Sequence, residues 1–214
     1  MYLLTGDYKF ELDICNDSDF KEVIRIGMIK EPRAYVEIHV EHDDSASIQS
    51  TEYDSVCCKD DDETIQMIKV ALILCINRHK YIKMIVVVDD AFYPINDNKR
   101  ILISPSRLLT GRLGWYQEYL GAEPSLKTLN MIKRIKPIQD NQNLEYWTFE
   151  NIKEIAEPML KERFGSLFGS TWTISKDTIM SYNIHYILQD IPKKIHLIKR
   201  KYGKPVIHFR SVVL

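Results

Sequence analysis

Apolar and polar residues alternate with a period of two along two early segments of the chain. Residues Tyr8–Ile14 and Ala34–His42 both follow this pattern, which is typical of strands with one buried face. A turn-forming cluster at 42–47 follows the second segment, and a weaker strand candidate spans Ile48–Cys58. The pattern therefore predicts an antiparallel hairpin after the first strand.

Between the first strand and the hairpin, the spacing of apolar residues changes to that of a helix. Asp17–Asp19 supplies helix-capping residues, and Phe20, Val23 and Ile24 fall on one helical face. The residue before a proline is disfavoured in α-helical conformation, so Glu31-Pro32 would end this element. We therefore predict a helix between the first strand and the hairpin.

A second helix is predicted by an acidic run followed by an apolar stretch. Asp60–Glu63 precedes Ile65–Ile76, in which Gln66 and Lys69 are the polar residues, and Asn77–Lys80 follows with positive charge. Negative charge at the start and positive charge at the end both suit the helix dipole. An apolar surface nearly all round predicts a helix that is buried on more than one side.

Residues Ile82–Val88 are almost continuously apolar and rich in β-branched side chains. This composition predicts a central strand covered on both faces. Asn96–Asn98 is a predicted turn, Lys99–Ile103 a short strand, and Ser104-Pro105 a helix start.

The second half of the chain has mainly helical spacing. Amphipathic helices are predicted at Leu126–Ile135 and Thr148–Phe164 around a polar linker at Gln139–Asn143, with another at Ser175–Ile187 and a final strand at Pro205–Val213. The predicted fold is mixed α/β (α+β), with a central mixed sheet and flanking helices in residues 1–124. Residues 125–214 form a helical extension whose last strand packs on this core.

Composition limits the partners of the chain. With 214 residues, 45% hydrophobic and 28% charged, it suits a globular protein with a substantial core. The formal net charge of -1 gives no general attraction to nucleic acid or anionic membranes. There is no signal-peptide pattern and no apolar run of about 20 residues, the length that spans a membrane. We therefore expect a soluble intracellular protein with no nucleic-acid or membrane partner.

Charge is nevertheless unevenly distributed. The segment Glu37–Glu63 is acidic, whereas Lys193–Arg210 is basic and contains Lys199, Arg200 and Lys201. Patches of opposite sign orient association more than they strengthen it. They suggest a protein partner or self-association through these three basic residues, and the alternative is a solvated basic face.

Two groups of residues are candidates for chemistry. Glu37 and His39 share one face of a predicted strand, where either could act as a general base for an amine; the alternative is a solvated face. His39 and Glu41 could also bind a metal together with Asp43 and Asp44. The cysteines have no ligand spacing, so we expect buried thiols and no metal site there.

The aromatic run Gly114–Pro124 is the second candidate. Tyr116 or Tyr119 could act as a general acid toward a leaving thiolate. The alternative is that Trp115 and Tyr119 pack on the core while Tyr116 lies on the surface.

The predicted order of strand, helix, hairpin, buried helix, strand, helix and aromatic-glycine turn resembles the acetyltransferase-like (GNAT) fold. Over residues 50–124, the segments Tyr53–Cys57, Thr64–Ile68, Asp89-Asp90 and Gly114–Glu118 also resemble uncharacterised proteins of large nucleocytoplasmic DNA viruses. The resemblance implies acetyl-coenzyme A at the start of the buried helix and beside the following strand. The corresponding cofactor-binding candidates are Thr64, Ile65, Val86 and Val88.

The helix start departs from that family. A coenzyme A loop supplies glycines and free N–H groups, whereas this chain has Asp60–Glu63, whose carboxylates repel a pyrophosphate. We therefore expect a noncatalytic viral or virion-associated interaction protein without a cofactor, in the host cytoplasm or the virion. The alternative is a divergent N-acetyltransferase that uses acetyl-coenzyme A, with Tyr116 and Glu37 as its catalytic residues.

Overall fold

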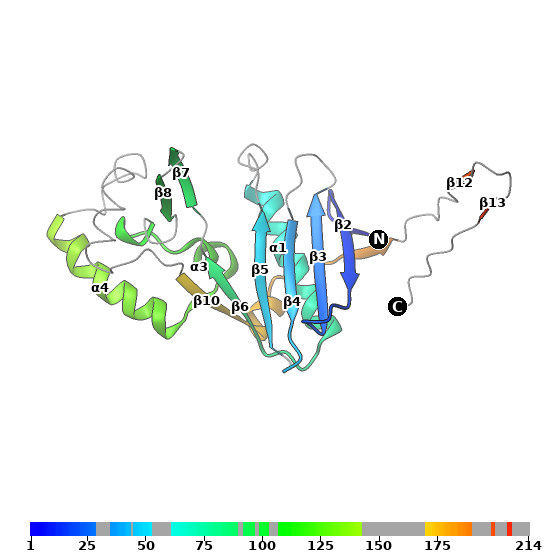
Figure 1. Ribbon diagram of the computed structural model, residues 1–214. Helices are drawn as coiled ribbons and strands as arrows, with labels where there is room; N and C mark the ends of the chain where they lie inside the picture. Colours follow the sequence, from blue (N-terminus) through cyan, green and yellow to red (C-terminus); the bar gives the residue numbers. More distant parts are fainter. Residues whose placement is uncertain are drawn as a thin grey trace.

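One large mixed sheet organises the protein (Figure 1). The computed structural model describes residues 1–28, 35–43, 45–52, 61–89, 92–96, 99–102, 107–142, 170–189, 198–199 and 205–206. In spatial order, the strands of the sheet are β11 (Ile187–Gln189), β1 (Tyr2–Thr5), β2 (Tyr8–Cys15), β3 (Glu22–Met28), β4 (Tyr35–Val40), β5 (Ala46–Glu52), β6 (Met84–Asp89), β10 (Ser170–Ser175) and β9 (Glu123–Pro124).

The remaining described elements are helices and two small strand pairs. The helices are α1 (Asp61–Arg78), α3 (Trp115–Leu120), α4 (Leu126–Gln142) and α6 (Lys176–Met180). The strand pairs are β7 (Phe92–Asn96) with β8 (Lys99–Leu102), and β12 (Ile198–Lys199) with β13 (Pro205–Val206). The mixed α+β class predicted from the sequence is confirmed.

The strand order combines an antiparallel meander with one crossover. Strands β1 to β5 pair with their sequence neighbours in antiparallel fashion. After α1 the chain returns as β6, which pairs parallel with β5. Strand β10 then lies between β6 and β9, antiparallel to both. The sheet thus includes two strands, β10 and β11, that come after residue 124.

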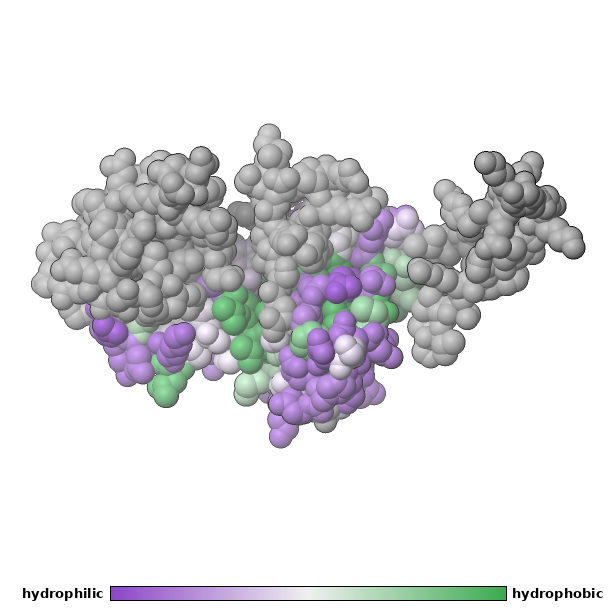
Figure 2. Space-filling view, viewed as in Figure 1, coloured by the Kyte–Doolittle hydropathy of each residue, from purple (hydrophilic) through white to green (hydrophobic). Residues whose placement is uncertain are grey.

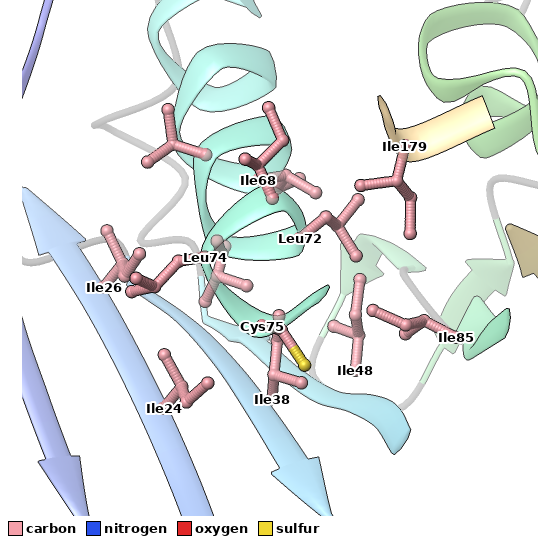
Figure 3. Close-up of a cluster of buried hydrophobic side chains, with 14 of the residues drawn as sticks. Ile24, Ile26, Ile38, Ile48, Ile68, Leu72, Leu74, Cys75, Ile85 and Ile179 are labelled. Carbon is pink, nitrogen blue, oxygen red and sulfur yellow. The ribbon is translucent and has the colours of Figure 1, made fainter. Parts of the chain in front are cut away.

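Helix α1 covers one face of the sheet, which we call the inner face (Figure 1). Ile68, Leu72 and Cys75 of α1 meet strand residues such as Ile38 and Ile85 in the core (Figure 3). Because α1 also contacts α3 and α6, nearly all its side chains from Thr64 to Ile76 are buried. Each fully buried Ile or Leu contributes about 1.5–3 kcal/mol, so α1 and the sheet stabilise each other.

The opposite side of the sheet, the outer face, carries a different set of residues. In β4, Val36, Ile38 and Val40 are buried, and the alternating residues Glu37 and His39 project to the outer face. In β6, Ile85 and Val87 face inward, while Met84 and Val88 are 53% and 52% exposed. The prediction that this strand is covered on both faces is therefore wrong; it is central in the sheet, and one face is open.

The helix predicted around residues 20–28 is also wrong, because this segment forms strand β3. Val23, Ile24 and Ile26 suit a strand as well as a helix, and pairing with β2 and β4 decides between them. The predicted N-cap has a different role: the Asp17 carboxylate accepts a hydrogen bond from the Asp19 backbone N–H at 2.9 Å. This is an Asx turn, which uses the same side-chain chemistry as a helix cap.

Most other predicted elements are confirmed. These are the strands now labelled β2, β4, β5, β6 and β8, the β4–β5 hairpin and the helices α1 and α4. Helix α4 continues to Gln142, so most of the predicted linker at 139–143 is helical. The helix predicted over 175–187 is limited to α6, and β13 is the described part of the predicted final strand. The predicted helix at 148–164, the turn residues 97–98, the helix start at 104–105 and the segment 53–58 lie outside the described residues.

Candidate functional site

Strands β5 and β6 separate soon after they meet. Their parallel pairing comprises Ser47 with Val86 and Ile48 with Val87, although β5 continues to Glu52 and β6 to Asp89. The register of β4 against β5 shifts at the same point, between Glu37 and Ile38. A bulge bends its strand, which explains why β5 leaves β6 here. We call the place where this pairing ends the β5–β6 split.

The strand register places several outer-face residues in one row beside the split. His39 of β4 is the Cα partner of Ser47 in β5, which is the partner of Val86 in β6. Neighbouring strands lie about 4.8 Å apart, so His39 is about 10 Å from Val86. Two residues from His39 along β4, Glu37 projects from the same face. The candidate base Glu37 and the candidate cofactor contact Val86 thus come from neighbouring parts of one surface.

Glu37 connects two basic side chains. Its carboxylate accepts hydrogen bonds from the Arg25 guanidinium and, through the other oxygen, contacts Nε2 of His39. Burial alone would raise the pKa of Glu37, but the hydrogen bonds and charges of Arg25 and His39 outweigh it and lower the pKa. Glu37 is therefore an ionised acceptor.

This pairing determines what His39 has available. A carboxylate accepts but does not donate, so His39 Nε2 carries the hydrogen and a neutral ring presents Nδ1 as an acceptor. The Nδ1 atom is buried and has no hydrogen-bond partner among the described residues. The Phe20 ring lies against the imidazole, with ring centroids 3.9 Å apart. Glu37 and His39 form a dyad, and in the neutral form of His39 its Nδ1 atom is a proton acceptor.

An apolar stripe runs beside this dyad along β6. Met84 and Val88 are more than half exposed, and Val86 lies between them on the same face. Figure 2 views the outer face, where a hydrophobic area lies over β6 next to a hydrophilic area over β2 to β4. Exposed apolar side chains on a central strand are candidates for contact with a ligand or partner.

The other predicted cofactor contacts lie elsewhere. Thr64 and Ile65 are in the first turns of α1, on the inner side, and both are buried. The Thr64 hydroxyl has no hydrogen-bond partner among the described residues. Asp62 is exposed and Glu63 half-buried at the same helix start. The structure therefore does not bring Thr64 and Ile65 onto the same face as Val86 and Val88.

Tyr116 lies in the core on the side of α1. It is 7% exposed, and its ring meets Trp115 edge-on at a centroid distance of 5.1 Å. Trp115 and Tyr119 are half-buried against the core, as the packing alternative predicted, but Tyr116 is not a surface residue. Tyr119 instead lines a pocket of about 470 Å³ with Arg107, Gly111, Arg112, Leu113 and Glu118. A general-acid role for Tyr116 stays a prediction.

The remaining candidate residues are the basic group Lys199–Lys201 and the acidic residues Asp43 and Asp44. Lys199 is in β12, and its side chain, Arg200, Lys201 and Asp44 lie outside what the structure describes. Asp43 accepts hydrogen bonds from the Ser45 N–H and hydroxyl and so closes a turn. In the described part of the chain, no group of three His, Cys, Asp or Glu side chains is placed to hold a metal. Nor is any described helix both long and apolar enough to cross a membrane.

Sequence patterns missed two members of this site. Arg25 was placed in a predicted helix, and Ser47 in a turn; only the strand register reveals that both lie beside Glu37 and His39. Comparisons with family models, curated proteins and solved structures gave no match to this chain.

Proposed function

We propose that this protein is a divergent acyltransferase with an acetyltransferase-like core, and that it binds an acyl thioester such as acetyl-coenzyme A across the β5–β6 split. One observation carries the proposal: the parallel pairing of β5 and β6 ends after Ser47–Val86 and Ile48–Val87, while both strands continue. An extended amide-containing ligand would lie along the strand segments beyond this pairing and add backbone hydrogen bonds to them.

The outer-face residues suit this chemistry. The apolar stripe of Met84, Val86 and Val88 would contact the acyl chain and its thioester arm. In the reaction, the amine nitrogen of the acceptor attacks the thioester carbonyl, the carbon–sulfur bond breaks and the thiol leaves. His39, oriented by Glu37, would take the proton from the amine through Nδ1.

A second candidate function is a noncatalytic interaction protein that uses the same surface to bind a protein partner. The acidic first turn of α1 favours it, since Asp62 and Glu63 lie where the related fold would bind a pyrophosphate. Charges about 4 Å apart repel by about 1 kcal/mol in water and by more where water is excluded. The exposed apolar stripe would then be covered by the partner.

Calorimetric titration with acetyl-coenzyme A separates the two functions. We expect binding in the wild type and at least tenfold weaker binding in Val88→Lys, because the new ammonium group occupies the apolar stripe. Met180→Lys is the matched control, since Met180 is 54% exposed but lies on α6. No heat of binding at millimolar ligand would refute the acyltransferase proposal.

An activity assay tests the roles of the dyad. Release of free thiol from acetyl-coenzyme A is followed with a panel of primary amines, and Glu37→Gln and His39→Asn should lower the rate by about 100-fold, the usual contribution of a general base. For the interaction protein, light scattering across salt concentrations should detect a complex that Val88→Lys, on the apolar stripe, and Lys199→Glu, in β12, each weaken. A monomer at every salt concentration that retains no partner on purification would contradict that alternative.

A further inference from the structure

A second polar network lies on the inner side of the sheet, at the end of α1 opposite the split. The Glu22 carboxylate of β3 is hydrogen-bonded to Arg78 at 2.9 and 2.5 Å and to Nε2 of His79 at 2.6 Å. The other ring nitrogen of His79, Nδ1, lies 2.9 Å from the Tyr81 hydroxyl. Glu22 and His79 are buried, whereas Tyr81 is 41% exposed. The series therefore runs from a buried carboxylate through an imidazole to a hydroxyl at the surface.

The direction of the hydrogen bonds follows from the acceptor at the buried end. Burial opposes it, but the hydrogen bonds of Arg78 and His79 lower the pKa of Glu22. The ionised carboxylate only accepts, so Nε2 of His79 carries the hydrogen. When the ring is neutral, its Nδ1 atom is the acceptor for the Tyr81 O–H. Nucleophile, base and orienting group stand in the order that activates a hydroxyl.

The surroundings of Tyr81 favour a developing negative charge. The Lys21 ammonium lies over the Tyr81 ring, 4.4 Å from its centroid. Lys176 reaches the same loop, where its ammonium donates to the Lys80 carbonyl at 2.6 Å. The molecule also contains an internal comparison: Lys9 lies 4.1 Å over the ring of Tyr2, which has no histidine contact among the described residues. Tyr2 is half-buried and Tyr81 exposed, so the comparison of Tyr81 with Tyr2 is completed by the loss of reactivity expected when His79 is replaced.

We propose that Tyr81 is a nucleophilic residue that accepts acyl groups from activated esters, with His79 as its general base and Glu22 as the positioning residue. In this step the Tyr81 oxygen bonds to the acyl carbon and the ester carbon–oxygen bond to the leaving group breaks. The phenolic proton passes to His79 Nδ1 and then to solvent. With a phenyl acetate as the activated ester, the products are an acetylated tyrosine and a free phenolate. The step requires no oxidant or cofactor. The site does not depend on the outer-face dyad.

The test uses p-nitrophenyl acetate with the intact chain of 214 residues. Acetylation of each tyrosine is followed over time by peptide mass spectrometry, and release of p-nitrophenolate is followed by absorbance. Tyr81 should be acetylated about 100-fold faster than Tyr2, the increase that a general base provides. Equal rates at Tyr81 and Tyr2 would overturn the proposal.

Three variants separate base catalysis from a purely structural contact. His79→Asn keeps a polar atom near the Tyr81 hydroxyl but is not a base, and Tyr81 should then react at the rate of Tyr2. Glu22→Gln can donate to Nε2 of His79, which moves the ring hydrogen to Nδ1 and removes the acceptor; it should have the same effect. Glu37→Gln, at the separate dyad, should leave Tyr81 unchanged. Circular dichroism verifies that each variant is folded, and fast acetylation of Tyr81 in folded His79→Asn would also overturn the proposal.

Discussion

The two faces of the sheet differ in what their side chains contact. On the inner face, apolar residues from seven strands, β1 to β6 and β10, and from α1 are almost completely buried, and Glu22 is held there by Arg78 and His79. On the outer face, Glu37 and His39 have polar partners, while Met84 and Val88 remain exposed. The same alternating strands thus produce a core on one side and a candidate binding surface on the other. Stability and function should therefore respond to different substitutions.

The largest expected difference is between Trp172 and Val88, which lie on adjacent strands. Trp172 is fully buried and donates a hydrogen bond from Nε1 to the Ser170 hydroxyl at 2.7 Å. Trp172→Ala should lower the free energy of unfolding by about 3–5 kcal/mol, measured by urea denaturation. Val88→Ala should change it by less than about 0.5 kcal/mol, because the side chain is already exposed. Similar losses in both variants would contradict the distinction between the faces.

A smaller effect is expected at Gly114, which lies directly against Trp172. A Cβ at this position would be 2.3 Å from a ring carbon of Trp172, closer than packed atoms come. Gly114→Ala should therefore destabilise the protein by about 1–3 kcal/mol through overpacking. Gly6→Ala is not an equivalent control, since its positive φ adds backbone strain. Thr173→Ala, on the outer side of β10, is a better control, and it should change the free energy of unfolding only slightly. A neutral Gly114→Ala in thermal unfolding would show that α3 can move away from β10.

Acid should weaken the inner network through Glu22. Burial alone would raise the pKa of Glu22, but Arg78 and His79 reverse this and lower it from 4.5. A carboxyl group whose pKa is lower in the folded state stabilises the fold above its unfolded pKa. That contribution is lost as pH falls below about 4.5 and through the lowered folded value.

The measurement is the unfolding free energy of wild type and Glu22→Gln between pH 7 and pH 3. The variant should be less stable at pH 7, and the difference should shrink toward pH 3. Glu37→Gln provides the comparison on the outer face. Because the pKa of Glu37 is also lowered, the stability difference between wild type and this variant should change with pH in the same direction. A gap between wild type and Glu22→Gln that stays constant with pH would contradict the role of the ionised carboxylate.

Elements with strong local patterns could be predicted from the sequence. Helix α1 was predicted correctly because its apolar stretch and its terminal charges both indicate a helix. Strands β2 and β4 were predicted correctly because apolar and polar residues alternate regularly along them. Strand β3 was predicted wrongly, because the spacing of its apolar residues fits both a helix and a strand. Its pairing with β2 and β4 selects the strand. Strand β10 was missed because it is six residues long and its partner β6 is distant in sequence.

The candidate site could be predicted only in part. Alternation along the strand placed Glu37 and His39 on one face, as the structure does. Their position relative to Val86 depends on the register of three strands and on the shift between Glu37 and Ile38. Such long-range pairing leaves no local signal, which is also why the Tyr81–His79–Glu22 series could not be found from spacing.

Hydrogen–deuterium exchange with saturating acetyl-coenzyme A most directly tests the claim that the outer face at the β5–β6 split is the ligand-binding site. We predict slower exchange in β5 and β6, residues Ala46–Glu52 and Met84–Asp89, and no change in β2, residues Tyr8–Cys15. Unchanged exchange in β5 and β6, or protection confined to other elements, would contradict the claim.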